Sequence, residues 1–128
     1  MKILVFAAML VSLLLGGCSA PPEEARLEPQ RWGKVIFEVE SRPAPVRVGM
    51  NEFLVIATEE RGRPVHDLIV SMRASDEQKW HQAIQDGLSG VYRRAIRVPS
   101  DARALTLLVQ RKRSDEETEL VFPFELKR

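Results

Sequence analysis

The chain has 128 residues, of which 45% are hydrophobic and 29% are charged. Its 19 basic and 18 acidic residues leave a net charge of +1, so it lacks the strong positive field that recruits nucleic acid, and we exclude that class of partner. The single cysteine excludes a disulfide within the chain, and the length suits one domain.

The first residues predict an export signal. Lys2 supplies a positive charge, the run 3–15 is apolar except for Ser12, and the small residues Gly16 and Gly17 follow. A positive start, a short apolar run and small residues before a cleavage site are typical of a secretory signal peptide. The run is shorter than the about 20 residues of a membrane-spanning helix, so we expect residues 1–17 to form a signal helix that is removed.

The tetrapeptide Leu15-Gly16-Gly17-Cys18 resembles the lipobox of bacterial lipoproteins. In that family the cysteine thiol is diacylated, the signal is cut before the cysteine, and the new amino group is acylated. The resemblance implies that Cys18 anchors the protein in a membrane, since several acyl chains hold a protein firmly where one holds it weakly. It places the domain in the periplasm. Ser19 favours the outer membrane, because enteric bacteria retain lipoproteins with aspartate at that position in the inner membrane.

A proline-rich stretch follows the cysteine. Pro21, Pro22 and Pro29 lie among charged residues and alanines, and prolines disfavour helix and leave an extended spacer. We therefore assign residues 18–33 to the lipidated cysteine and a flexible tether. Residues 34–128 are left as the folded domain.

From residue 34 onward, apolar residues recur with period two, which predicts β-strands. Segment 53–57 is apolar on both faces, as expected of a central strand, and Pro123 marks the last strand as an edge strand. The expected strands cover residues 34–40, 51–58, 65–74, 90–98, 104–111 and 119–126, with Leu120, Phe122, Phe124 and Leu126 pointing inward in the last.

Segment 79–85 fits two interpretations. Trp80, Ala83, Ile84 and Leu88 match a helical stripe, but the neighbouring segments are β and the intervening space is short, so we expect a strand, before which a short helical turn at 75–78 can be placed. Counting it gives about seven short strands at regular spacing. The fold class expected is all-β, an immunoglobulin-like β-sandwich preceded by the signal helix and the tether.

Three short motifs lie in a characteristic order along these strands. They are VGMNEFLV at 48–55, GRPV at 62–65 and GVY at 90–92. Together they resemble the YtkA-like or FixH-like domain, although the tryptophan common in that family is missing from the strand with Leu105 and Leu107. The resemblance implies an immunoglobulin-like sandwich outside the cytoplasm. It implies little about activity, although some relatives sit near copper handling or cytochrome oxidase assembly.

Copper binding is the first site hypothesis. His66, His81, Met50 and Met72 supply imidazole and thioether groups, which suit Cu(I). No His-x-His or Met-x-x-Met cluster is present, and Met72 shares a predicted inward face with Leu68 and Val70. Core methionines and surface histidines therefore explain the pattern better, and we expect no resident cofactor.

Catalysis and partner binding are the other hypotheses. Ser71, His81 and Asp86 form a trio that any chain of this length offers, and no nucleophile elbow, HExxH motif or phosphate loop is present, so we expect no enzyme. Arg93 and Arg97 should share the outer face of one strand, where they would suit an acidic partner or form a solvated face. The sequence thus predicts a membrane-anchored lipoprotein that acts by binding, with an envelope protein as a candidate partner and a copper-binding accessory as the alternative.

Overall fold

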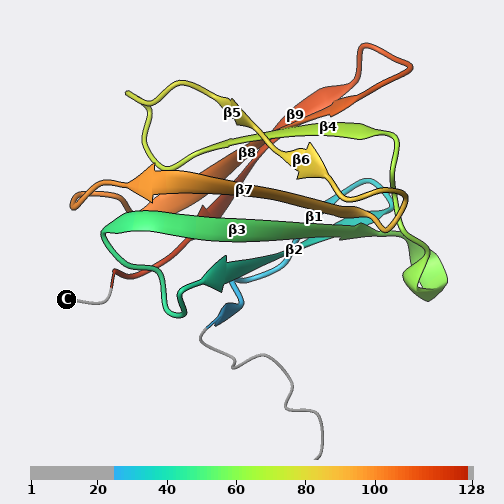
Figure 1. Ribbon diagram of the computed structural model, residues 1–128. Coiled ribbons are helices and arrows are strands. Elements are labelled where there is room, and N and C mark those ends of the chain that lie inside the picture. Colours follow the sequence, from blue (N-terminus) through green and yellow to red (C-terminus); the bar gives the residue numbers. More distant parts are fainter. Residues whose placement is uncertain (1–24, 127–128) are drawn as a thin grey trace, which may run out of the picture.

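The period-two segments form nine β-strands in two antiparallel sheets within residues 25–126, the part of the chain that the computed structural model describes (Figure 1). A short 3₁₀ helix, η2 (Glu60–Gly62), lies between the third and fourth strands. The strands are β1 (Gln30–Trp32), β2 (Val35–Arg42), β3 (Gly49–Thr58), β4 (Leu68–Arg73), β5 (His81–Gln82), β6 (Ile84–Gln85), β7 (Val91–Val98), β8 (Ala104–Arg111) and β9 (Glu117–Pro123).

The two sheets form an all-β sandwich with the immunoglobulin strand order. One sheet has the order β1-β2-β3-β7-β6 and the other β5-β4-β8-β9. Taken from β2 onward, the first sheet reproduces the A-B-E-D order of an immunoglobulin domain, and β4-β8-β9 reproduces C-F-G. The predicted fold class is confirmed. None of the helical segments in the described range is long and apolar enough to cross a membrane.

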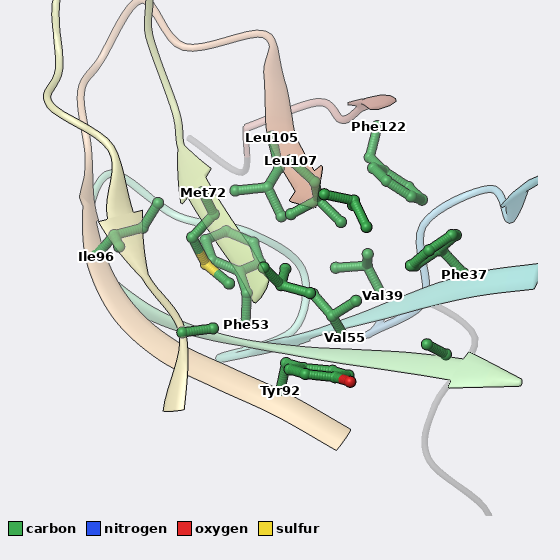
Figure 2. Close-up of a cluster of buried hydrophobic side chains, with 14 of the residues drawn as sticks. Phe37, Val39, Phe53, Val55, Met72, Tyr92, Ile96, Leu105, Leu107 and Phe122 are labelled. Carbon is green, nitrogen blue, oxygen red and sulfur yellow. The ribbon is translucent and has the colours of Figure 1, made fainter. Parts of the chain in front are cut away.

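The core is built from the alternate residues that the period-two pattern turns inward (Figure 2). Because side chains alternate between the two faces of a strand, one set from each sheet meets in the middle. The prediction that segment 53–57 belongs to a central strand is also confirmed, since β3 lies between β2 and β7. The largest fully buried side chains come from both sheets: Phe37, Phe53, Tyr92 and Ile96 from the first, and Leu68, Met72, Leu105, Leu107 and Phe122 from the second.

The turn before β3 explains why glycine and asparagine stand there. Gly49 has φ +104°, a backbone conformation that residues other than glycine rarely adopt. Asn51 is 1% exposed, and its side-chain amide donates to the carbonyl oxygens of Arg47 at 2.6 Å and Gly49 at 3.0 Å, while its oxygen accepts from the Arg47 N–H at 3.1 Å. The asparagine therefore holds the turn and aligns the start of the central strand.

Segment 79–85 is β, as expected, but it is not one strand. β5 pairs with β4 in one sheet and β6 pairs with β7 in the other. The chain therefore crosses between the sheets at Ala83, whose N–H donates to the Val70 carbonyl at 2.7 Å. The helical stripe was misleading, because Ile84 and Leu88 are exposed. A turn precedes this segment, closed by the Gln78 N–H on the Ser75 carbonyl at 3.2 Å.

The assignment of residues 18–33 to a tether is wrong for residues 25–33. Ala25 is buried, the Leu27 N–H donates to the Val39 carbonyl at 2.9 Å, and β1 pairs with β2. Pro29 did not prevent this, because prolines are tolerated before a short edge strand. Cys18 and the remainder of the predicted tether lie outside the described residues.

The last strand is shorter than predicted. β9 is at the edge of its sheet, as Pro123 indicated, but it ends at that proline. Phe122 is fully buried, whereas Leu120, Phe124 and Leu126 are only partly buried against the core. The chain continues along the sandwich without strand pairing, held by the Phe124 N–H on the Arg103 carbonyl at 3.0 Å.

Candidate functional site

The four candidate copper ligands do not form a common site. Met72 and His81 are directly opposed on β4 and β5, but Met72 is fully buried and packs among core side chains (Figure 2). Met50 is 56% exposed at the start of β3, and His66 is exposed beyond the other end of that strand. Within residues 25–126, no three His, Cys, Asp or Glu side chains cluster so as to hold a metal ion. The geometry therefore gives copper no support.

Arg93 and Arg97 are both exposed on the outer face of the five-stranded sheet. Their cross-strand neighbours on β3 are Leu54 and Met50, whose side chains point to the same face. The two arginines therefore share one face, as the period-two pattern indicates. Their role in binding a partner stays a prediction.

A pocket of about 680 Å³ lies at one end of the sandwich, where three loops meet. These loops are 59–67 between β3 and β4, 86–90 between β6 and β7, and 112–116 between β8 and β9, all at the right-hand end in Figure 1. Its volume is within the range of small-molecule sites, and loops held by a rigid sandwich commonly carry binding residues. The lining residues are Glu59, Pro64, Val65, His66, Asp67, Gln85, Gly87, Leu88, Lys112 and Arg113.

Gln85 ties the loops together. Its side-chain N–H donates to the His66 carbonyl in the β3–β4 loop, and its oxygen accepts from the Lys112 ammonium in the β8–β9 loop at 2.7 Å. The Lys112 N–H in turn donates to the Asp67 carbonyl at 2.9 Å. Because both ends of the Gln85 amide are used, one side chain from β6 fixes the position of the other two loops.

The wall of the pocket depends on a close approach at Gly90. The Gly90 carbonyl accepts from the Ala57 N–H, and the Ala57 carbonyl accepts from the Val65 N–H, both at 2.9 Å. A Cβ atom at Gly90 would lie 2.7 Å from the Ala57 carbonyl oxygen and 2.9 Å from Pro64 Cβ, and the residue has φ +78°. A larger side chain would therefore push the β6–β7 turn away from the β3–β4 loop.

Tyr92 supports the same wall from inside the core. The residue is 1% exposed, and its hydroxyl donates to the Val65 carbonyl at 2.8 Å. Burial raises the pKa of the Tyr92 phenol from 10.0 to about 12. The backbone at Leu68 opposes this shift through a hydrogen bond, and the negative charge of Asp67 adds to it. The neutral phenol, which can donate a hydrogen bond, is the form that the fold favours.

The charges around the pocket are not all compensated. Glu59 pairs with Arg63 at 3.4 Å, and Asp67 with Arg111 at 3.8 Å, and neither arginine lines the pocket. Among residues 25–126, neither Lys112 nor Arg113 forms an ion pair. The two carboxylates are thus engaged at the pocket margin, while the two cations are left facing it.

Comparison with protein-family models, with curated proteins and with solved structures found no match to this chain. The resemblance of the three motifs to the YtkA-like or FixH-like domain therefore stays a prediction. The candidate site rests on the geometry of this chain alone.

Most of the pocket residues were not predicted from the sequence. The expected strands leave connecting segments at 59–64 and 112–118, but the pattern gives no reason to single out Gln85, Leu88, Lys112 or Arg113. One signal was present, because the GRPV and GVY motifs contain the residues that form the wall. Pro64 and Val65 of the first motif meet Gly90 and Tyr92 of the second.

Replacement of Tyr92 by phenylalanine tests the wall directly. The variant keeps the ring but leaves the Val65 carbonyl without its buried donor, so we expect a loss of about 1–2 kcal/mol in the free energy of unfolding. Chemical denaturation of the full chain measures it. A change under about 0.3 kcal/mol would mean that the hydrogen bond contributes nothing to stability.

The raised pKa of Tyr92 also predicts how the stability of the fold depends on pH. The titration can be followed directly, since Tyr92 is the single tyrosine of the chain. The pKa of Tyr92 is about 12 in the folded chain and 10.0 in the unfolded chain. The contribution of the neutral phenol to the free energy of unfolding is therefore fully present below pH 10 and is lost as the pH rises toward 12. Ultraviolet absorbance should give a midpoint near 12 in the folded chain and near 10 in denaturant. A folded midpoint near 10 would contradict the burial of the phenol.

Proposed function

We propose that this chain is an envelope lipoprotein, anchored through acylated Cys18, whose β-sandwich is a binding module that contacts its ligand at the loop-end pocket. The observation that carries the binding role is the bridge made by Gln85 between the two flanking loops. A pocket whose walls are fixed before binding loses less conformational freedom when it is occupied, which favours binding at that place.

The composition of the pocket also favours binding over catalysis by a hydroxyl or thiol nucleophile. Among its described lining residues, none carries the hydroxyl or thiol that nucleophilic catalysis uses. The Gln85 amide of the lining is instead engaged in structural hydrogen bonds at both ends. This chemistry suits recognition by contact, with apolar and charged groups presented side by side.

The position of the pocket is compatible with an anchor at Cys18. The described chain enters along β2, where Arg26 forms an ion pair with Glu40 at 3.9 Å. Glu40 is four residues from Ile36, which is paired with Thr58 at the pocket end of β3, a separation of roughly 13 Å along the strand. The entry point and the pocket therefore lie at different levels of the sandwich. The resemblance to an extracytoplasmic sandwich supports the same envelope location.

Mass spectrometry of the protein from its native envelope tests the anchor. We expect a chain that begins at Cys18 and carries three acyl groups, because the Leu-Gly-Gly-Cys sequence places the thiol at the cleavage site. In a Cys18→Ser variant, the acyl groups should be absent and the signal should stay uncleaved. A native chain with an intact, unlipidated Met1 start would contradict the proposal.

Site-specific photocrosslinking tests the binding role. A photoreactive p-benzoylphenylalanine in place of Leu88, which is 70% exposed on the pocket rim, should give a discrete adduct in the native envelope. The matched control replaces Met50, which is 56% exposed at the opposite end of the sandwich. Equal adducts at both positions, or none at Leu88, would exclude the pocket as the contact surface.

A further inference from the structure

We propose that the pocket binds the oxyanion of an acidic ligand, a carboxylate or a phosphate, between Lys112 and Arg113, with an apolar group of the same ligand against Leu88. The inference rests on the proposed binding role and names the chemistry of its ligand. Three features of the described residues lead to it: the pairing of the charges, the fixed position of Lys112 and the apolar rim.

Two lining cations, Lys112 and Arg113, form no ion pair within residues 25–126. The carboxylates of Glu59 and Asp67 are paired with arginines outside the lining. Arg111, which pairs with Asp67, also pairs with Glu116 of the β8–β9 loop at 3.0 Å. Asp86 and Asp115, in the same loops, form no ion pair in the described range, but neither lines the pocket. A bound anion would supply the charge that the two lining cations lack.

Two hydrogen bonds position Lys112 at the pocket. Its backbone is fixed to the Asp67 carbonyl, and its ammonium donates to the neutral Gln85 oxygen at 2.7 Å. An ammonium has three donors, so this bond fixes its place without neutralising its charge and leaves donors for a ligand. Arg113 follows in the same turn and also lines the pocket. Its guanidinium offers the planar fork of donors that matches the two oxygens of a carboxylate or phosphate.

Leu88 adds an apolar surface beside these cations. It is the most exposed of the large hydrophobic side chains in the described range, at 70%. The Ser89 hydroxyl donates to the Asp86 carbonyl at 2.6 Å and so holds the turn that carries Leu88 at the rim. Apolar surface next to fixed cations suits a ligand with a carbon chain near its acidic group. A terminal carboxylate of a peptide has that chemistry.

NMR titration of the ¹⁵N-labelled full chain in detergent micelles tests the proposal with three probes. They are N-acetyl-leucine, its neutral amide N-acetyl-leucinamide, and inorganic phosphate. We expect N-acetyl-leucine to shift the amide signals of Leu88, Lys112 and Arg113, and the neutral amide to leave them unchanged. Tighter binding of N-acetyl-leucine than of phosphate would identify the source as a carboxylate with an apolar neighbour, and the reverse order would identify a phosphate. Raised salt should weaken either anion.

A matched pair of charge-removing variants separates the site from the overall charge. Lys112→Gln with Arg113→Gln should raise the Kd by about tenfold or more, since two charge-assisted contacts are lost. Arg47→Gln with Arg103→Gln removes the same charge from exposed positions at the other end and should leave the Kd unchanged. Equal effects of the two double variants would overturn the proposal.

Failure of this inference can be told apart from failure of the binding role. If neither anion shifts the pocket signals while Leu88 still crosslinks in the envelope, the anion site is excluded and the binding role stands. If an anion binds while Leu88 gives no crosslink, the anion site stands and the envelope contact at this pocket is excluded.

Discussion

The pocket end of this sandwich depends on one buried hydrogen bond, from the Tyr92 hydroxyl to the Val65 carbonyl at 2.8 Å. A strand of one sheet thereby holds the loop that leads into the other sheet. The contact requires Gly90 two residues earlier, because any side chain there would meet Ala57 and Pro64. The Gln85 bridge joins the same loop to the β8–β9 loop, so the shape of the pocket follows from how firmly that loop is held. An unpaired carbonyl in this buried place would cost about 1–3 kcal/mol.

Much of the fold could be predicted because period-two alternation reports directly which face of a strand is buried. The pattern identified β2, β3, β4, β7 and β8 to within a few residues, together with the central place of β3 and the edge place of β9. It failed where burial is not periodic. β5 and β6 are each two residues long and belong to different sheets, so neither extends far enough to alternate. β1 was missed because the preceding prolines dominate the local composition.

The site was harder to predict than the fold because its contacts join residues that are far apart in the sequence. Gln85 reaches His66 across 19 residues and Lys112 across 27. No local sequence pattern indicates such long-range contacts, so nothing in the sequence distinguishes Gln85 from other polar residues. Met72, in contrast, could be predicted from the local pattern, because its alternation with Leu68 and Val70 indicates a core position. The structure confirms that Met72 is buried, and this burial keeps its thioether away from the other candidate copper ligands. The GRPV and GVY motifs, which only resemble a family pattern, contain the two sides of one contact in the structure.

The proposed binding role requires that the pocket at one end of the sandwich is fixed before any ligand arrives. Amide hydrogen exchange at Val65 in the ligand-free full chain tests this most directly, since that N–H donates to the Ala57 carbonyl behind the pocket wall. We predict that the Val65 amide is protected about as strongly as the amides of Val55 and Leu107 in the central strands. Exchange of the Val65 amide at the rate of an unstructured loop would contradict it.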